Sequence, residues 1–416
     1  MKKKNILRMA TTILAMIVII VGCGEKKSLI FNLTITTNDG GTAIAAPAGQ
    51  IEAGTRVTLT ATPEYGHTFE KWIVVSGSAS IDDIHATSAT FVMPRQAVEI
   101  RAEFGGLALS AIFPDPAFRG WVAGKFDDNN DGIISPAELT AIAACKTIAF
   151  PLDHVTTIAD LTGIDYFTAL MTLDCSNNQL TKLNLSANTA LVHLSCDTNK
   201  LIELNLSANT ALTHLYCGNN LLTSLSLSTN ISLTNLGFSN NQLTQIDLSK
   251  NNALMYLYCN DNRLTSIDPS ANTLLTYLHC NNNQLTGLNL LPNTSLTSLS
   301  CSGNKLTQLT LSVNTALTNL DCSGNQLTSL ELLTNTALRI IACNNNKLAN
   351  LNLATCTDLK SLACGYGTAN PLTVTVAAGS TPGAISVEAH SGTGSSIMGS
   401  FGPGNTLNGV TVIVAP

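Results

Sequence analysis

The sequence predicts a mostly β protein in which a solenoid with short strands on two sides follows a small β domain and a helical cap. The first observation is a run of nine tandem units of 21 residues, from Leu170 to Asp358, with no insertion or deletion. A fixed period of this kind indicates a solenoid, because one unit cannot bury its apolar face alone whereas a stack of units can. The other two observations precede the repeats: alternating residues between Gly and Pro turns, and a polar loop between two helical segments.

Each unit follows the pattern L-x-x-L-x-C-x-x-N-x-L-x-x-L-x-L-x-x-N-T-x. Leu173 and Cys175 point to one side of the chain and the residues beside them to the other, which is the alternation of a strand. Leu183 and Leu185 repeat this alternation in the second half of the unit, so we expect two short strands per coil, each pairing in parallel with its copies. The pattern resembles the leucine-rich repeat family in its 21-residue bacterial IRREKO class, and the resemblance covers nearly half of the chain.

Two columns of asparagine run through the units. An asparagine side chain has donors and acceptors for backbone groups left unpaired at a turn, so nine in register predict a buried hydrogen-bonded ladder rather than solvated turn residues. The first column consists of Asn178, Asn199, Asn220, Asn241, Asn262, Asn283, Asn304, Asn325 and Asn346. The second column runs from Asn188 to Asn335 and breaks at Cys356.

Nine of the twelve cysteines also share one column, and Phe238 takes the place of the missing member. A column that accepts phenylalanine is a core column, and free cysteine behaves as a small buried hydrophobe. The odd count prevents complete pairing, and the C-x-x-C spacing of zinc or redox sites is absent. We therefore expect reduced core thiols rather than disulfides or a metal site.

Residues 1–22 read as an export signal, with a basic start and an apolar segment from Met9 to Val21. A spanning helix is the alternative, but the segment falls short of the roughly 20 residues that it needs. Residues 20–23 resemble a bacterial lipobox, which implies cleavage before Cys23, lipidation of Cys23, and a linker over residues 23–27. The resemblance predicts an exported protein, lipid-anchored at the bacterial cell envelope and exposed at its surface. Acyl chains would anchor it without a membrane span.

Residues 28–104 predict the small β domain. The segments 66–72, 91–94 and 98–104 resemble the divergent internalin B-repeat module, which is common as a stalk in bacterial surface proteins. Trp72 is either a ligand platform or part of the small core, and we expect the core.

Residues 127–138 match the twelve-residue EF-hand loop, in which hard oxygen ligands at fixed spacings suit Ca²⁺. Gly132 allows the sharp turn at the sixth position. The expected calcium ligands are Asp127, Asn129, Asp131, Ile133 through its carbonyl, Ser135 and Glu138. Alternatively, Ser135 and Glu138 form only a capping box of the second helix. The flanking helices, with Asp115 as a cap, extend this EF-hand-like N-terminal cap over residues 113–147, which by resemblance covers the end of the solenoid.

The solenoid is expected over residues 148–364, where 149–169 reads as a degenerate first coil. The period fails after Cys364, and residues 365–416 predict a C-terminal β cap or a small separate domain.

The composition argues against nucleic acid as a partner, because the net charge is −6 and only 12% of residues are charged. The chain contains no H-E-x-x-H, no G-x-S-x-G, no P-loop and no dinucleotide fingerprint. We therefore expect a protein that is not an enzyme.

The outward positions 3 and 5 of the first strand form the face that leucine-rich proteins commonly use for ligands. Tyr and His gather there over units two to six, as His193, His214, Tyr216, Tyr256, Tyr258, Tyr277 and His279. We call these seven residues the aromatic patch, and we expect Asn235 and Gly237 to leave a shallow dip in its middle. The alternatives are that exposed aromatics merely favour strands, or that His193 and His214 hold zinc.

These features together predict a bacterial cell-surface lipoprotein whose solenoid binds a protein or glycan partner in adhesion or host interaction, with calcium stabilising the N-terminal cap. A structural envelope protein without a specific ligand is the alternative.

Overall fold

The computed structural model describes residues 28–364 except 39, 65 and 151–156, and beyond residue 364 it describes five strands. The predicted export signal and Cys23 therefore lie outside the described residues. The chain divides into two compact units. One contains the chain up to Ile112 together with Asp127–Glu138, and the other contains Phe113–Phe126 and the chain from Leu139 onward. Among the described residues, no helix is long and apolar enough to cross a membrane.

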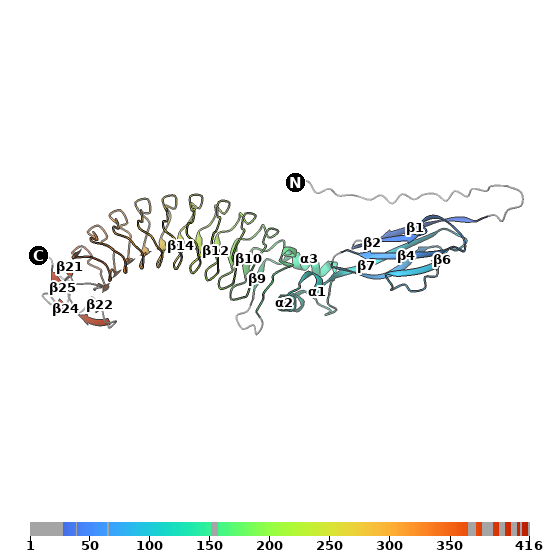
Figure 1. Cartoon of the computed structure of the whole chain (residues 1–416), viewed down its shortest axis with the longest axis horizontal. Coiled ribbons are helices and arrows are strands. Elements are labelled where there is room, and N and C mark those ends of the chain that lie inside the picture. The colour runs from blue at the N-terminus through green and yellow to red at the C-terminus, as the bar shows by residue number, and fades with distance from the viewer. Residues whose placement is uncertain are drawn as a thin grey trace. The chain divides into compact units, whose positions relative to one another are not determined.

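The first unit is a sandwich of two sheets, as its alternating sequence predicts (Figure 1). One sheet has the order β3-β1-β7-β5 with β8 added to β7, and the other has the order β2-β4-β6. Inward side chains of both sheets make the core, in which Trp72 is 2% exposed and donates its indole N–H to the Ala86 carbonyl at 3.0 Å. Trp72 is thus a core residue. The strands are β1 (Ile30–Thr37), β2 (Gly41–Ala46), β3 (Gly49–Glu52), β4 (Arg56–Pro63), β5 (His67–Ser76), β6 (Ser88–Val92), β7 (Val98–Ala108) and β8 (Ile133–Ile134).

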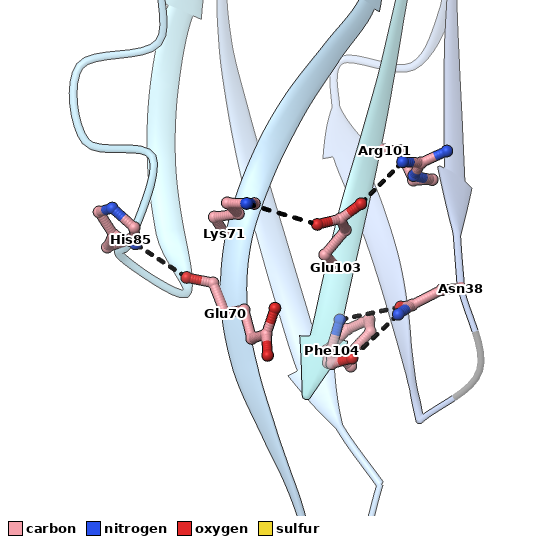
Figure 2. A network of polar contacts seen from close by, with 7 residues as sticks. All are labelled: Asn38, Glu70, Lys71, His85, Arg101, Glu103 and Phe104. Atoms are coloured by element: carbon pink, nitrogen blue, oxygen red, sulfur yellow. Dashed lines mark hydrogen bonds and ion pairs between the residues drawn. The ribbon is translucent and has the colours of Figure 1, made fainter. Parts of the chain in front are cut away.

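A polar network links the strands of the larger sheet (Figure 2). The Asn38 side chain, just after β1, donates to the Phe104 carbonyl at 2.9 Å and accepts the Phe104 N–H at 2.8 Å. On β7, Glu103 contacts Arg101 at 2.7 Å and Lys71 of β5 at 3.8 Å. The two Asn38 bonds continue the pairing of β1 with β7 past the end of the ladder. The ion pairs of Glu103 are partly exposed and contribute little stability.

Three short helices join the two kinds of architecture: α1 (Leu109–Ile112), α2 (Pro116–Phe126) and α3 (Pro136–Ala144). Asp115 caps α2, because one carboxylate oxygen accepts the N–H groups of Ala117 and Phe118, both at 2.9 Å. Its other oxygen accepts the Ala159 N–H at 2.8 Å, so the same side chain ties the helix to the first coil. Aromatic rings of α2 and of the first coil pack together beside it, among them Phe118, Trp121 and Phe167.

The solenoid stacks one short strand per coil into a parallel sheet, which Figure 1 shows as a single curved row of coils. In every coil from Leu170 to Asp358, position 4 is buried and positions 3 and 5 face outward, so the predicted fold class, a leucine-rich repeat solenoid, is confirmed. The strands are β9 (Thr147–Ala149), β10 (Thr172–Asp174), β11 (His193–Ser195), β12 (His214–Tyr216), β13 (Asn235–Gly237), β14 (Tyr256–Tyr258), β15 (Tyr277–His279), β16 (Ser298–Ser300), β17 (Asn319–Asp321), β18 (Ile340–Ala342) and β20 (Ser361–Ala363). A 3₁₀ turn, η1 (Ile164–Tyr166), precedes the first repeat.

The expected second strand of each coil forms only at the end of the solenoid, as β19 (Asn350–Leu353). In the described coils before it, that side alternates between buried and exposed residues but is not a strand. Local bonds compete with a ladder there, because the Asn184 side chain accepts the Ser186 N–H at 3.1 Å and the same turn recurs at Asn205 and Asp247.

The two sides of the solenoid continue separately into the C-terminal segment. On the sheet side β22 (Ser386–His390) pairs with β20, and β23 (Ser396–Ser400) then pairs antiparallel with β22. On the other side β21 (Leu372–Val376) pairs with β19, and β25 (Val410–Val414) pairs with β21 and with β24 (Thr406–Leu407). These pairings place the described strands in line with the last coils.

The cysteine column lies inside the solenoid. All nine members and Phe238 are buried, and every cysteine of the described residues is a free thiol. Burial raises the pKa of Cys280, Cys322 and Cys364 to about 12. The column therefore packs as apolar core, as expected.

The two asparagine columns are both buried but are not equivalent. In the first, each side chain from Asn199 to Asn346 donates to backbone carbonyls of its own and the preceding coil; Asn199, for example, donates to Cys175 and Cys196 and accepts the Leu180 N–H at 3.0 Å. In the second, each side chain donates to two carbonyls while its oxygen has no partner, from Asn188 to Asn335. Where this column breaks, the Cys356 thiol donates to the Asn335 carbonyl at 3.7 Å in place of the amide.

Candidate functional site

The structure brings the seven residues of the aromatic patch together on the outward face of β11 to β15. Because the strands pair in register, His193 lies opposite His214, Tyr256 opposite Tyr277, and Tyr258 opposite His279. Each of these pairs is in ring contact. The centroid distances are 4.4 Å for His193 and His214, 5.1 Å for Tyr256 and Tyr277, and 5.3 Å for Tyr258 and His279.

The middle of the patch is filled and not hollow. Gly237 is buried, and a β-carbon added there would come 2.9 Å from the Tyr216 ring. The Tyr216 hydroxyl also accepts a bond from the Asn235 amide at 3.4 Å. The expected dip at Asn235 and Gly237 is therefore wrong, because the Tyr216 ring leans along the stack into the space that glycine leaves.

Ring orientation determines what the patch presents to a partner. Tyr256 and Tyr277 are stacked with only 20° between their planes, so each covers a face of the other. The ring edges and hydroxyl groups of such a pair can combine apolar contact with hydrogen bonding. Burial raises the pKa of Tyr258, and the neighbouring tyrosines, first of all Tyr216, add to the rise.

Two histidines of the patch, His214 and His279, have lowered pKa values. Burial lowers the pKa of His214, and the adjacent His193 lowers it further. Burial also lowers the pKa of His279, which Asp321 partly offsets. Because neutral imidazoles predominate at neutral pH, the patch carries little charge of its own.

A groove lies on the strandless side of the first coils. It has a volume of about 770 Å³ and is lined by small hydroxyl and amide side chains and by Lys182, Glu203, Asp160 and Asp165. No aromatic side chain lines it. Aromatic anchors dominate binding energy at most interfaces, so the patch is the stronger candidate despite its flatter shape.

The EF-hand-like loop folds around its own carboxylates. Asp127 is buried, and its two oxygens accept the N–H groups of Asp131 at 3.2 Å and Gly132 at 3.0 Å. Gly132 has a φ of 77°, as the sharp turn requires. Glu138 reaches back to the start of the loop, where it accepts the Asp128 N–H at 3.0 Å.

The capping box is also present in this loop. Glu138 accepts the Ser135 N–H at 2.8 Å, and the Ser135 hydroxyl accepts the Glu138 N–H at 3.3 Å. These bonds, with that from Asp128, lower the pKa of Glu138. The donor set of carboxylate, amide and carbonyl oxygens suits Ca²⁺. Within the described residues, no three His, Cys, Asp or Glu side chains converge as a metal site. Calcium therefore remains a proposal.

The chain is similar to one known protein family and to several solved structures. Residues 31–106 match the family described as "Divergent InlB B-repeat domain". The solved functional domain of InlJ from Listeria monocytogenes, which includes a cysteine ladder, is 38% identical with a TM-score of 0.59. The chain thus has a leucine-rich repeat solenoid and is similar to this internalin. The match to InlJ covers 63% of this chain but only 57% of that domain, so this internalin-like protein spans little more than half of it.

Two further solved structures resemble the internalin-like chain more distantly. Internalin InlF of Listeria monocytogenes is 22% identical over 62% of this chain and 91% of that chain, with a TM-score of 0.44. A leucine-rich repeat protein of Leptospira interrogans is 22% identical over 54% and 64% of the two chains, with a TM-score of 0.47. No curated protein sequence matches.

Proposed function

We propose that this internalin-like protein is a bacterial cell-surface lipoprotein whose solenoid binds a partner through the aromatic patch, in adhesion or host interaction. The observation that carries the proposal is the set of three ring contacts, His193 with His214, Tyr256 with Tyr277, and Tyr258 with His279, on one outward face. Tyrosines gathered on a rigid scaffold bring large contact area at low conformational cost. Lipidation of Cys23, with the β domain as a stalk, would hold the solenoid away from the membrane.

A protein partner fits the patch better than a glycan does. Sugar rings stack on open aromatic faces, whereas Tyr256 and Tyr277 each already cover one face of the other. Ring edges and hydroxyls suit the side chains and backbone groups of a protein surface. The similar internalins are leucine-rich repeat proteins, and that likeness supports a binding role over an enzymatic one.

Calcium is part of the proposal as a stabiliser of the N-terminal cap. Asp127, Asn129, Asp131, Ser135 and Glu138, with the carbonyl of Ile133, would supply its oxygen ligands. The capping box and a calcium site do not compete, because each Glu138 oxygen has lone pairs beyond the one that accepts a backbone N–H.

Capture from host secretions and from bacterial polysaccharide, by the wild type and by a Tyr256→Ala, Tyr258→Ala double variant, tests the patch. We expect the double variant to weaken binding of the captured partner at least about tenfold. Alanine at Ser300 or Asn319, on the same face outside the patch, is the matched control and should change affinity little. Unchanged binding by the double variant removes the patch as the site, and capture of polysaccharide alone overturns the choice of protein. If nothing is captured, the structural envelope role is favoured.

A further inference from the structure

His193 and His214 occupy the same outward position of two neighbouring coils. Their Cα positions are paired directly in the ladder between β11 and β12, and their ring centroids are 4.4 Å apart at an angle of 42°. No lysine or arginine occupies position 3 or 5 of any of the nine units, so no fixed positive charge on this face opposes a cation. The pair forms one edge of the aromatic patch, but its chemistry differs from that of the tyrosines.

The surroundings of His214 select one of its nitrogens. The Thr213 hydroxyl lies 2.8 Å from Nδ1 of His214 and 3.2 Å from the Val192 carbonyl. The equivalent threonines of later coils, such as Thr276 and Thr297, also donate to the carbonyl of the coil before. A hydroxyl has a single hydrogen, so when Thr213 donates it to Val192, as the distances allow, it can only accept the Nδ1–H of His214.

In that tautomer Nε2 of His214 carries an unshared lone pair. Among the described residues neither Nε2 of His214 nor either ring nitrogen of His193 has a hydrogen-bond partner. A histidine whose Nδ1–H is held by an oxygen acceptor, with Nε2 free, has the arrangement that metal-binding histidines adopt.

Two imidazoles at this separation can both reach one transition-metal ion. Such an ion lies about 2.0–2.1 Å from each ligating nitrogen, which rings with centroids 4.4 Å apart can satisfy. Imidazole ligands suit Zn²⁺, Ni²⁺ and Cu²⁺, whereas Mg²⁺ and Ca²⁺ prefer oxygen. No third His, Cys, Asp or Glu joins the pair in the part of the chain that the structure describes, so water or a donor from a partner would complete the coordination.

We propose that His193 and His214 form an open, two-ligand site for a divalent transition-metal ion at the edge of the aromatic patch. The ion bridges the repeat units that begin at Leu191 and Leu212, through one nitrogen of each ring. Its open coordination positions face outward, where a carboxylate or imidazole of a bound protein can reach them. The site goes beyond the proposed function and does not depend on it, because the ion needs no partner to bind.

Calorimetric titration of the protein with Ni²⁺ and with Zn²⁺, in excess Ca²⁺ to occupy the EF-hand-like loop, tests the site. The variants are His193→Asn and His214→Asn, since asparagine occupies this position naturally at Asn235 and Asn319. Each should weaken binding of one equivalent at least about tenfold, because even loss of an outer-shell partner usually costs that much. Mg²⁺ should give no binding at this site.

His279→Asn is the matched control, because it removes a histidine from the same face that has no second histidine beside it. It should bind Ni²⁺ and Zn²⁺ as the wild type does. Equal affinity in the wild type, His193→Asn and His214→Asn overturns the proposal, and so does a loss in only one of the two variants. Neither result bears on the tyrosines, so the partner-binding proposal stands or falls on its own experiment.

Discussion

Alanine substitutions at Asn262 and Asn272 should separate the two asparagine ladders, although both side chains are buried in the same coil. Asn262 accepts the Leu243 N–H at 3.1 Å and donates to the carbonyls of Phe238 and Cys259. In Asn262→Ala those carbonyls each keep one amide donor from a neighbouring coil. The Leu243 N–H loses its acceptor and is left buried without one.

Asn272 has a different environment. It donates to the carbonyls of Leu248 and Asn251, at 3.2 and 2.8 Å, and its own oxygen has no partner. Both carbonyls also accept backbone N–H groups, from Asn251 and from Leu254. Asn272→Ala therefore leaves no backbone group unpaired and removes a buried oxygen that had no partner.

The two substitutions should lower the free energy of unfolding by different amounts. A buried N–H left without an acceptor costs about 1–3 kcal/mol, whereas an ordinary hydrogen bond contributes about 1 kcal/mol net. Both substitutions remove the same side-chain atoms, so the difference comes from the unpaired N–H. We expect Asn262→Ala to destabilise the protein by roughly 2 kcal/mol more than Asn272→Ala. Exposure alone predicts the opposite order, because Asn262 is 8% exposed and Asn272 is 0% exposed.

Equilibrium unfolding in urea, followed by circular dichroism, measures the difference as a shift of the transition midpoint at unchanged slope. Wild type and both variants are compared at one pH and one calcium concentration. Equal destabilisation, or a greater loss in Asn272→Ala, would refute the assignment of different roles to the two ladders.

Three further predictions concern metal, charge and thiols. Calcium at a hundredfold excess over its Kd should stabilise the wild type by about 2.7 kcal/mol relative to chelator, and Asp127→Ala with Glu138→Ala should abolish the difference; identical melting in all four samples excludes the site. Burial raises the pKa of Asp197, so its ionisation costs stability as pH rises through that raised value; Asp197→Asn should melt higher at pH 7 and lose this advantage near pH 3, and a lower melting temperature at pH 7 would contradict the reasoning. The nine column cysteines should react with a thiol reagent only after denaturation, whereas disulfides in the intact mass without reductant would refute the buried-thiol interpretation.

The repeat made much of the solenoid predictable from sequence. The period of 21 residues determined which leucines, cysteines and asparagines are buried, and the alternation around Leu173 gave the outward positions. The strandless second side was not predicted, because Leu183 and Leu185 alternate as strand residues do. The turn at Asn184 decides that backbone, and its bond to the Ser186 N–H is a local competition that side-chain periodicity does not register.

The sequence predicted which residues of the aromatic patch lie together, but not how their rings are oriented. Parallel strands in register bring positions 3 and 5 of neighbouring coils together, so the seven residues of the patch followed from the sequence alone. Ring directions did not follow, because they depend on the rotamers that neighbouring coils allow. The stacking of Tyr256 on Tyr277 and the hydrogen bond from Nδ1 of His214 to Thr213 are consequences of packing that only coordinates reveal.

The fourth repeat unit, Leu233–Ala253, shows how the repeat and the patch depend on each other. It is the coil in which Phe238 replaces the column cysteine and Gly237 stands where other coils carry a side chain. As a break in the pattern it would divide the aromatic residues into two groups. The Tyr216 ring instead lies over Gly237, in a space that even a β-carbon would enter at 2.9 Å. Tyr216 thereby covers the position of the fourth unit that lacks a side chain. The departure from the repeat thus keeps an aromatic ring at the middle of the patch, which supports a binding role for this face more strongly than the number of aromatic residues alone does.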